Sequence, residues 1–421
     1  MDIANIAITI FYFLIVLGVL VLVHELGHYV LAKRFGVRVE EFGIGYPPRA
    51  VQLWKERGWI QIQGKQIVIP RRFKLPPGVL TGAWVTYRTR VDQGREVLAA
   101  IEPVEPAQRG MAAASQVQAL EPGTIYSLNW LPLGGFVRMT GEENPSDPRS
   151  FAAQRPLVRA LILVAGAGMN VVLAIVLFTL IATAPQVKTI EVVTIEAVAA
   201  NSPAESAGIR PGDQLLTIDG QPIENRQDAQ RIIYGQAGQE ISIELKRGNQ
   251  QLTVPVTPRV NPPRDEGPTG IRLCTECQVL AQRSVSYPLW EAFPLGIART
   301  WETAGAIFTG FRRLAQGTAP QGSVGGPVEI GRVTGLACQA GLLSCMEFTA
   351  LLSVNLAVIN LFPFPALDGG RLMFVILEGL RRGKRIAPEK EGLVHFVGMA
   401  ILLLLMVLIT FNDVRRLFGS G

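Results

Sequence analysis

The stretch Val23-His24-Glu25-Leu26-Gly27-His28 lies in an apolar run, Ile6–Ala32, that is long enough to cross a bilayer. On a helix, His24 and His28 are four residues apart and share one face. Two imidazoles at this spacing can bind one zinc ion, and Glu25 beside them can take a proton from an attacking water. The alternative is a chance pattern in an amphipathic core helix. The chain has only three histidines, however, and ionisable groups in a lipid-spanning helix are costly unless they are paired, metal-bound or facing a polar cavity.

A second apolar segment, near the end of the chain, supplies a candidate third ligand. It contains Pro363 and Pro365, followed by Asp368-Gly369-Gly370. Zinc held by two histidines in a catalytic site takes a third protein ligand and leaves one position open, so Asp368 is the candidate. The prolines have a structural role, because they break the helix, and freed backbone is tolerated at membrane depth only beside protein or a water-filled cavity. Alternatively, Asp368 caps a helix at the membrane boundary, and the two roles are compatible.

The composition predicts a membrane protein with several spans. Of its 421 residues, 48% are hydrophobic. Four stretches are apolar enough to cross a bilayer: Ile6–Ala32, Leu157–Ala184, Met346–Leu367 and Leu393–Phe411. The second stretch contains Gly166-Ala167-Gly168-Met169-Asn170, and small residues at this spacing allow close helix packing. We expect Asn170 to have a structural role in the protein interior, because an amide in mid-membrane needs a hydrogen-bond partner.

Basic residues beside the spans predict an orientation. The N-terminal flank carries no Lys or Arg, which argues against a cleaved signal peptide, whereas Lys33 and Arg34 follow the first span. By the positive-inside rule, the N-terminus lies outside and the segment after His28 faces the cytoplasm. Arg415 and Arg416 oppose this orientation. The larger basic clusters support it: Arg155, Arg159, Arg381, Arg382, Lys384 and Arg385. The net charge of +6 then indicates attraction to the cytoplasmic leaflet, and no nucleic-acid partner is predicted.

The cytoplasmic segment that follows the first span is predicted to be rich in strands. Alternating and turn residues predict four of them: Val37–Ile44, Trp59–Ile69, Val79–Tyr87 and Ile125–Met139. Val91–Pro122, rich in Ala, Glu, Gln and Arg, predicts a surface insertion with weak helical character and no assigned role. The glycine-kinked stretch Leu131–Met139 is either an ordinary hairpin or a β-loop that reaches the active site.

A soluble module is predicted for Val187–Pro258. A short helix, a turn at Pro211-Gly212-Asp213, a strand and a second turn at Asp219-Gly220 follow one another. This string resembles a PDZ domain of the bacterial, circularly permuted type, which binds peptide ends by adding a strand to a sheet edge. The alternative is a small β-module that only fills space.

Four cysteines lie in segments that the predicted topology places outside, where disulfides form: Cys274, Cys277, Cys338 and Cys345. Three pairings are possible and the sequence does not choose among them. Between the two cysteine pairs, Tyr287–Leu314 predicts an amphipathic helix, either at the membrane interface or packed on the module.

Taken together, HELGH, the NxxPxPxLDGG pattern, the PDZ string and Leu131–Met139 resemble the site-two protease family of intramembrane zinc metalloproteases, in particular its bacterial RseP-like group. The resemblance covers most of the chain. It implies Zn2+ bound by His24, His28 and Asp368, with Glu25 as the catalytic base. It also implies a substrate-binding role for Asn360 and a membrane-associated β-structure around Leu131–Met139. Four residues there are the candidates for contacting the substrate: Gly135, Phe136, Val137 and Arg138.

The predicted fold is a polytopic α-helical membrane protein with about four transmembrane helices, a cytoplasmic membrane-associated β-structure and an extracytoplasmic PDZ module. The predicted division is 1–34, first transmembrane helix with HELGH; 35–156, cytoplasmic β-rich segment with the insertion; 157–186, second transmembrane helix; 187–260, PDZ module; 261–345, extracytoplasmic linker with the amphipathic helix; 346–380, third transmembrane helix; 381–391, cytoplasmic loop; and 392–421, fourth transmembrane helix and tail.

The predicted function is zinc-dependent endoproteolysis in a bacterial cytoplasmic (inner) membrane. The expected partners are single-pass membrane protein substrates, the lipid bilayer and peptide ends at the PDZ module; the resemblance implies anti-sigma factors or remnant signal peptides as substrates. Two alternatives are a membrane PDZ scaffold and a metal or proton transporter that uses His24, His28 and Asp368 as a pathway. Two measurements discriminate among them. A scaffold would tolerate Glu25→Gln without loss of function. A transporter would move zinc or protons in vesicles.

Overall fold

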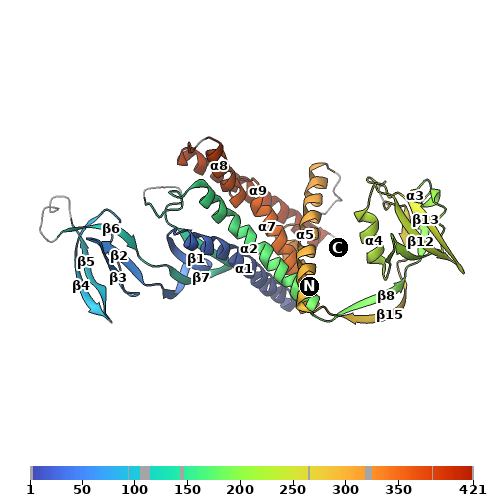
Figure 1. The fold of residues 1–421 in the computed structure, drawn as a ribbon, viewed down its shortest axis with the longest axis horizontal. Coiled ribbons are helices and arrows are strands. Elements are labelled where there is room, and N and C mark those ends of the chain that lie inside the picture. The colour runs from blue at the N-terminus through green and yellow to red at the C-terminus, as the bar shows by residue number, and fades with distance from the viewer. Residues whose placement is uncertain are drawn as a thin grey trace. The chain divides into compact units, whose positions relative to one another are not determined.

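The computed structural model describes residues 3–92, 94–104, 114–142, 147–263, 266–317, 325–381 and 383–419. The chain divides into two units (Figure 1). The first unit comprises Met1–Ile181 and Leu289–Gly421 and holds all four apolar helices; the second comprises Ala182–Pro288. Arg382, part of the predicted basic cluster, lies outside the described residues.

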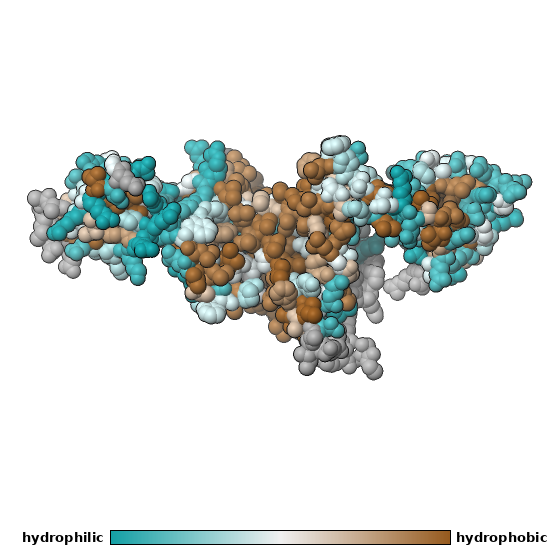
Figure 2. Space-filling model, turned by 90° about the horizontal axis from the view of Figure 1, so that it is seen from below, coloured by the Kyte–Doolittle hydropathy of each residue, from teal (hydrophilic) through white to brown (hydrophobic). Residues whose placement is uncertain are grey.

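Among the described residues, four helices are long and apolar enough to cross a membrane: α1 (Ile3–Arg34), α2 (Pro156–Thr183), α7 (Leu342–Leu361) and α9 (Pro388–Gly419). Large apolar side chains stay exposed along them, for example Phe396, Leu404 and Val407 on α9. Figure 2 shows hydrophobic residues gathered over the helical part of the molecule. Water does not tolerate so large an apolar surface, whereas lipid does. The predicted membrane protein with four spans is confirmed at this level.

The bounds predicted for the third span were wrong. α7 begins at Leu342 and so includes Cys345, and it ends at Leu361, before the prolines. Residues 362–367 are not helical, and α8 (Asp368–Leu380) then begins. Proline explains the break, because it lacks the N–H that a continuing helix needs and its ring collides with the preceding turn.

Two further helices pack against the spans. α5 (Leu289–Ala315) corresponds to the predicted amphipathic helix, and its Ala304 and Ile307 pack in a cluster with Phe178 of α2 and Val354 of α7. It therefore packs on the spans of its own unit, an arrangement that the sequence analysis did not propose. The helix α6 (Pro327–Gln339) was not predicted.

Two long strands, β1 (Val39–Lys55) and β7 (Ile125–Met139), form a twisted ribbon. Both strands bend, so that Gly43 lies opposite Phe136 on one side and Ser127 on the other. Gly43 has no room for a side chain, because a Cβ would lie within 2.6 Å of Asn129 Nδ2. At the far end of the ribbon Lys55 pairs with Ile125.

Between the two ribbon strands the chain forms a closed barrel in the order β2-β3-β5-β4-β6. Its strands are β2 (Gly58–Ile62), β3 (Lys65–Ile69), β4 (Trp84–Asp92), β5 (Arg95–Pro103) and β6 (Ser115–Glu121). The core contains aliphatic side chains from all five strands: Ile60, Ile62, Ile67, Ile69, Val85, Leu98, Ile101, Val117 and Leu120. The barrel barely exposes these residues to water, and their burial stabilises it.

The prediction of weak helical character for Val91–Pro122 was wrong, because β5 and β6 lie there; residues 93 and 105–113 lie outside the described residues. The composition of this segment favours a helix, but its buried Leu98, Ile101 and Val117 complete the barrel core. Packing against neighbouring strands overrides local preference in such cases. The predicted strand Trp59–Ile69 is a hairpin that turns at Gly64.

The described part of the second unit contains two helices, α3 (Pro203–Ser206) and α4 (Arg226–Gly235), and eight strands. The strands are β8 (Gln186–Val192), β9 (Ile195–Val198), β10 (Gln214–Ile218), β11 (Gln221–Pro222), β12 (Ile241–Arg247), β13 (Gln250–Val256), β14 (Ile271–Leu273) and β15 (Gln278–Val285). Four of them form the sheet β11-β10-β12-β13. Buried Asp213 lies in the predicted turn and accepts hydrogen bonds from Arg247, which hold the pKa of its carboxyl below the usual value.

The predicted end of this module at residue 260 was too early. β14 pairs with β9, and β15 pairs with β8, so the chain returns to the unit before α5 begins. β14 is only three residues long and follows a stretch that contains Pro262 and Pro263, so the sequence gives little indication of a strand there. The cysteines form two disulfides, Cys274–Cys277 and Cys338–Cys345, which is one of the three pairings that the sequence allowed.

Candidate metal centre

The two histidines of HELGH lie on one face of α1, as the spacing predicts. Their side chains are almost fully buried, with 7% of His24 and 6% of His28 exposed. The two Nε2 atoms are 3.2 Å apart, and the rings meet edge to face. An α-helix brings residues i and i+4 together without further help, so this half of the site follows from local geometry.

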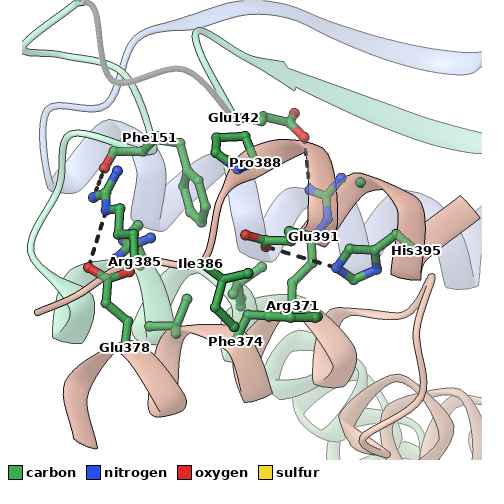
Figure 3. Close-up of a pocket in the computed structure, with 15 residues that line it drawn as sticks. Glu142, Phe151, Arg371, Phe374, Glu378, Arg385, Ile386, Pro388, Glu391 and His395 are labelled. Atoms are coloured by element: carbon green, nitrogen blue, oxygen red, sulfur yellow. Dashed lines mark hydrogen bonds and ion pairs between the residues drawn. The ribbon is translucent and has the colours of Figure 1, made fainter. Parts of the chain in front are cut away.

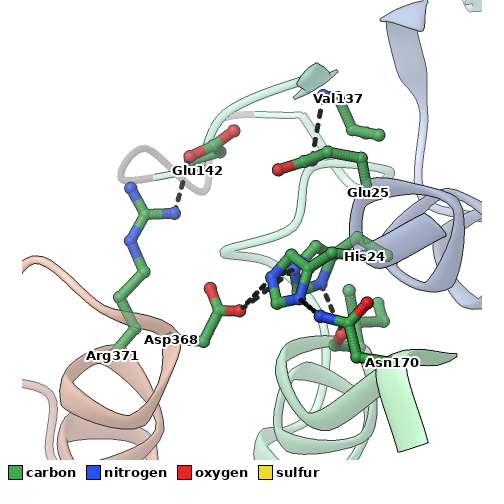
Figure 4. A network of polar contacts seen from close by, with 9 residues as sticks. His24, Glu25, Val137, Glu142, Asn170, Asp368 and Arg371 are labelled. Carbon is green, nitrogen blue, oxygen red and sulfur yellow. Dashed lines mark hydrogen bonds and ion pairs between the residues drawn. The ribbon is translucent and has the colours of Figure 1, made fainter. Parts of the chain in front are cut away.

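Asp368 reaches the same point from the other end of the chain. Its Oδ2 lies 3.0 Å from His24 Nε2 and 3.1 Å from His28 Nε2 (Figure 4). The N-cap of α8 is Leu367 and Asp368 is its first helical residue, so Asp368 is not the cap of this helix. A carboxylate in the first turn of a helix is also favoured by the helix dipole.

The three donor atoms fit a zinc ion. They lie within 4.8 Å of one another. Tetrahedral zinc with bonds of about 2.0–2.1 Å to nitrogen and oxygen holds its ligand atoms about 3.3 Å apart, close to the separations seen here. Two imidazoles and one carboxylate are also a ligand set that zinc hydrolases use.

Helix α2 forms one wall of the site. A Cβ on Gly166 would lie within 2.7 Å of His24 Nε2 and closer still to His28 Nε2, so only glycine leaves this space open. His28 Nδ1–H donates to the carbonyl oxygen of Ile162 at 2.8 Å, which fixes its ring. The expectation that helix packing alone explains the glycines is wrong for Gly166, because it borders the histidines; a Cβ on Gly168 would meet nothing within 4 Å.

Asn170, also on α2, is fully buried beside the first histidine. Its Nδ2 lies 3.2 Å from His24 Nδ1. Its backbone carbonyl accepts a hydrogen bond from Ser353 Oγ of α7 at 2.8 Å. Its amide oxygen is buried without a hydrogen-bond partner among the described residues.

The ribbon holds Glu25. The Val137 N–H donates to Glu25 Oε2 at 3.1 Å (Figure 4). The ribbon lies against α1 at Gly134 and Gly135, where a Cβ would crowd Val21 and Leu22 respectively. Strand β7 therefore reaches the residue that follows His24 in the chain.

The other predicted substrate-binding residues lie on β7 next to Val137 or at the end of α7. Phe136 and Arg138 follow Gly135 on β7, and the Arg138 guanidinium stacks 5.7 Å from the Phe136 ring centroid. Asn360 is half-buried in the last turn of α7, and its side chain makes no hydrogen bond with any residue that the structure describes.

The turn before Asp368 is built by tight packing. Predicted Pro363 and Pro365 lie in it, and Ala366 has a φ of +81°, which side chains rarely adopt. Gly370 packs on Pro365, where a Cβ would lie 3.0 Å from the proline Cα. Gly369 likewise packs on the last turn of α7. The two glycines after Asp368 are thus required by the fold of the turn.

His395 of α9 was missed by the sequence analysis, although it is the third of three histidines and lies in an apolar span. Its Nδ1 accepts a hydrogen bond from the Ala366 N–H at 3.0 Å. It lines a cavity of about 300 Å³ to which α8 also contributes, for example with Phe374 and Glu378 (Figure 3). The contact depends on how α9 packs on the turn, so the sequence alone did not predict it.

Charged groups also fix α8, and these were not predicted as partners. Arg371 Nη1 donates to Glu142 Oε2 at 2.8 Å (Figure 4). In the same cavity Glu378 pairs with Arg159 of α2, and its other oxygen accepts from Arg385 Nε at 3.2 Å (Figure 3). α8 is therefore held by ion pairs along its length.

Comparison with known proteins agrees with this geometry. A family model described as Peptidase family M50 matches residues 12–66 and 110–405. The zinc metalloprotease RasP of Oceanobacillus iheyensis is 33% identical, over 97% of this chain and 99% of its own. The regulator of sigma-W protease RasP of Bacillus subtilis is 30% identical over the same shares of the two chains.

Among solved structures, the PDZ domain of an SdrC-like protein of Listeria monocytogenes is 22% identical, covers 20% of this chain and 90% of that domain, and gives a TM-score of 0.19. The family model and the RasP relatives between them span the helices, the ribbon and the candidate metal centre. The chain belongs to peptidase family M50, the site-two protease family, and is a zinc-dependent intramembrane metalloendopeptidase.

Proposed function

We propose that the protein cleaves single-pass membrane proteins at a zinc ion held by His24, His28 and Asp368. The convergence of these three donor atoms from α1 and α8, beside Glu25, is the observation that carries the proposal. When bound, zinc supplies a Lewis acid for the attack of water on a peptide carbonyl. All other steps fall to the chain's own residues.

Glu25 is the proposed base. It follows His24 directly, and its carboxylate is held by the Val137 N–H at 3.1 Å. We propose that it takes a proton from the attacking water and delivers it to the leaving amide nitrogen. One oxygen is oriented by the ribbon, which leaves the other available for this transfer.

The hydrogen bonds of the two histidines suit a ligand role. His28 donates from Nδ1, so its neutral ring presents the lone pair on Nε2. With His24 Nε2 also a ligand, the His24 ring proton sits on Nδ1 and needs an acceptor. Turning the Asn170 amide by 180° presents its oxygen, which otherwise has no partner among the described residues. We propose that Asn170 fixes the ring in this way.

The ribbon is the proposed substrate platform. A helical substrate hides its carbonyls in its own hydrogen bonds and must open before cleavage, and in lipid the freed groups need new partners. Strand β7 pairs with β1 along one edge, where Val137 lies opposite Phe42. The Val137 N–H points to the other edge, where it donates to Glu25. A substrate strand added there would compete with Glu25 for that N–H. Asn360 at the end of α7 is a further proposed contact.

We propose trimmed, single-pass proteins of a bacterial cytoplasmic membrane as substrates, such as anti-sigma factors or remnant signal peptides. The name of the Bacillus subtilis relative, a regulator of sigma-W protease, supports the first of these. The second unit is the proposed PDZ module, which would bind peptide ends and exclude untrimmed substrates. The proposed orientation places the N-terminus outside and the metal centre toward the cytoplasm.

Co-expression with a trimmed single-pass substrate tests the proposed function. We expect the substrate to accumulate uncut with Glu25→Gln and to be cut with the wild type and with Glu102→Gln, an exposed glutamate of β5. Cleavage by Glu25→Gln at the wild-type rate would remove Glu25 from the catalytic role.

Cysteine labelling tests the proposed orientation. In a variant without native cysteines, a cysteine at Ser242 should react from outside, and one at Arg90 only after the cells are permeabilised. Reaction at Arg90 from outside would invert the proposed topology.

A further inference from the structure

One end of the β2–β6 barrel carries a cavity of about 550 Å³ that the peptidase function does not use. Its wall consists of five arginines, one aspartate and three apolar residues: Arg57, Arg71, Arg72, Arg90, Arg95, Asp92, Val68, Pro70 and Val97. The residues of the candidate metal centre take no part in this wall.

The strand register explains why these arginines meet. Gly58 pairs with Ile69, which puts Arg57 beside the end of β3 and the turn that holds Arg71 and Arg72. Val68 pairs with Val97 where β3 and β5 run parallel, and Val97 pairs with Arg90 of β4. Three separate chain segments thus bring arginine to the same end of the barrel.

The cavity is strongly positive, because its arginines lack internal partners. None of the five makes an ion pair or a side-chain hydrogen bond with any residue in the described ranges. Elsewhere in the same unit arginines are paired, as in Arg49–Glu41 at 2.6 Å and Arg149–Glu121 at 2.6 Å. Five arginines against one carboxylate in the wall, that of Asp92, leave an excess of positive charge that favours an anionic ligand.

This cavity also lies largely outside the family match. The family model leaves residues 67–109 unmatched, and that range contains every wall residue except Arg57. Four of the five arginines are therefore carried by a segment that the family model does not match.

We propose that this arginine cavity binds a ligand that carries two or more phosphate groups. Guanidinium groups present forked N–H donors that match phosphate oxygens in pairs, and five of them exceed what one phosphate can engage. The volume lies within the usual range of small-molecule sites. Val68, Pro70 and Val97 add an apolar floor that the non-phosphate part of the ligand would cover.

Two sources supply this chemistry: a soluble polyphosphate and a phospholipid with two phosphates. Both would engage the same arginines, so the experiment has one arm for each. The full-length protein is placed in phosphatidylcholine nanodiscs and titrated with sodium tripolyphosphate by calorimetry. In the second arm, part of the phosphatidylcholine is replaced by cardiolipin, and protection of the barrel amides is followed by hydrogen exchange.

The variant Arg90→Glu/Arg95→Glu reverses two charges of the wall. Arg88→Glu is the matched control for Arg90→Glu alone, because Arg88 is an exposed arginine of the same strand, β4, that does not line the cavity. In the arm where wild type binds, we expect the double variant to weaken binding at least about tenfold, since each lost charge-assisted hydrogen bond is costly, and the control to change it far less. Arg71→Gln, which removes one charge without reversing it, should give an intermediate loss.

Absence of binding in both arms would overturn the proposal. Equal losses for Arg88→Glu and the single variant Arg90→Glu would also overturn it, because both change the charge by the same amount and binding would then follow the overall charge of the barrel. Hydrogen exchange of the β2–β6 amides without ligand checks that each variant keeps the barrel folded. Because the readouts are binding and protection, the outcome is independent of proteolysis.

Discussion

The two halves of the candidate metal centre are built in different ways. α1 supplies two donors from one uninterrupted helix of 32 residues, and the spacing of the histidines alone brings them together. α8 supplies the third donor after a broken turn, whose shape depends on Gly369, Gly370 and on His395 from another helix. The first half needs only the helix to bring its two donor atoms together. The second half depends on contacts remote in sequence, and mutations can separate the two.

Removal of any ligand should have the largest effect. His24→Ala, His28→Ala and Asp368→Ala should each reduce bound zinc to background and abolish cleavage, more than the about 10- to 100-fold that supporting residues cost. Glu25→Gln should retain zinc and still lose cleavage, which separates binding from proton transfer. Zinc is measured by mass spectrometry on purified protein. Full zinc content in Asp368→Ala would show that α8 contributes no ligand and that the comparison is mistaken.

A methyl group opposite the histidines should be nearly as harmful. Gly166→Ala places a Cβ within 2.7 Å of His24 Nε2, so we expect zinc affinity and cleavage to fall together by about 100-fold, the upper end for a supporting residue. Gly168→Ala is the matched control, since a Cβ there meets nothing within 4 Å. Chelator competition gives the affinity. Similar losses in both variants would attribute the effect to helix packing.

Loss of the hydrogen bond between Ala366 and His395 should loosen the turn before Asp368 without unfolding it. His395→Phe keeps a ring but leaves the Ala366 N–H without its acceptor, so we expect zinc affinity to fall about tenfold. His395→Asn retains an acceptor and should recover part of the loss. Chelator competition measures this effect apart from cleavage. Unchanged affinity in His395→Phe would mean that the turn holds its shape without α9.

A change in the ribbon should lower the rate of cleavage without changing the zinc content of the protein. Val137→Pro removes the N–H that holds Glu25, so we expect a several-fold fall in cleavage, as for one lost hydrogen bond to a charged group. Val137→Ala keeps the N–H and serves as the control. Substrates with Gly or Pro near the cut should lose less, because they need less help to open. Equal losses for stiff and weak substrate helices would confine the role of the ribbon to orienting Glu25.

The same contrast explains what the sequence could predict. Helix geometry places His24 and His28 on one face. Pro363 and Pro365 predict that the helix is broken before Asp368. The site could therefore be located from these residues. Gly166 and His395 carry no local signal that links them to the metal centre, because their roles depend on which faces of α2 and α9 pack inward.

The β-structure was harder to predict for the same reason. The barrel closes by pairing β2 with β6, which lies some 55 residues further along the chain, and no local pattern encodes that closure. The segment that contains β5 and β6 was therefore judged by composition alone. The ribbon strand Ile125–Met139, by contrast, was predicted with its observed bounds, because its turn residues and apolar run mark it locally.

The junction between ribbon and barrel has a consequence for how such a protein evolves and how it can be engineered. The chain leaves the ribbon at Lys55 and returns at Ile125, its register partner, and the Glu56 N–H bonds to the Thr124 carbonyl at 2.9 Å. Lys33 of α1 binds both side chains, Glu56 at 2.6 Å and Thr124 at 2.8 Å. Residues 57–123 thus begin and end at adjacent, hydrogen-bonded positions of the ribbon. A segment with such adjacent ends can be inserted, deleted or exchanged as a whole while the ribbon keeps its strand register.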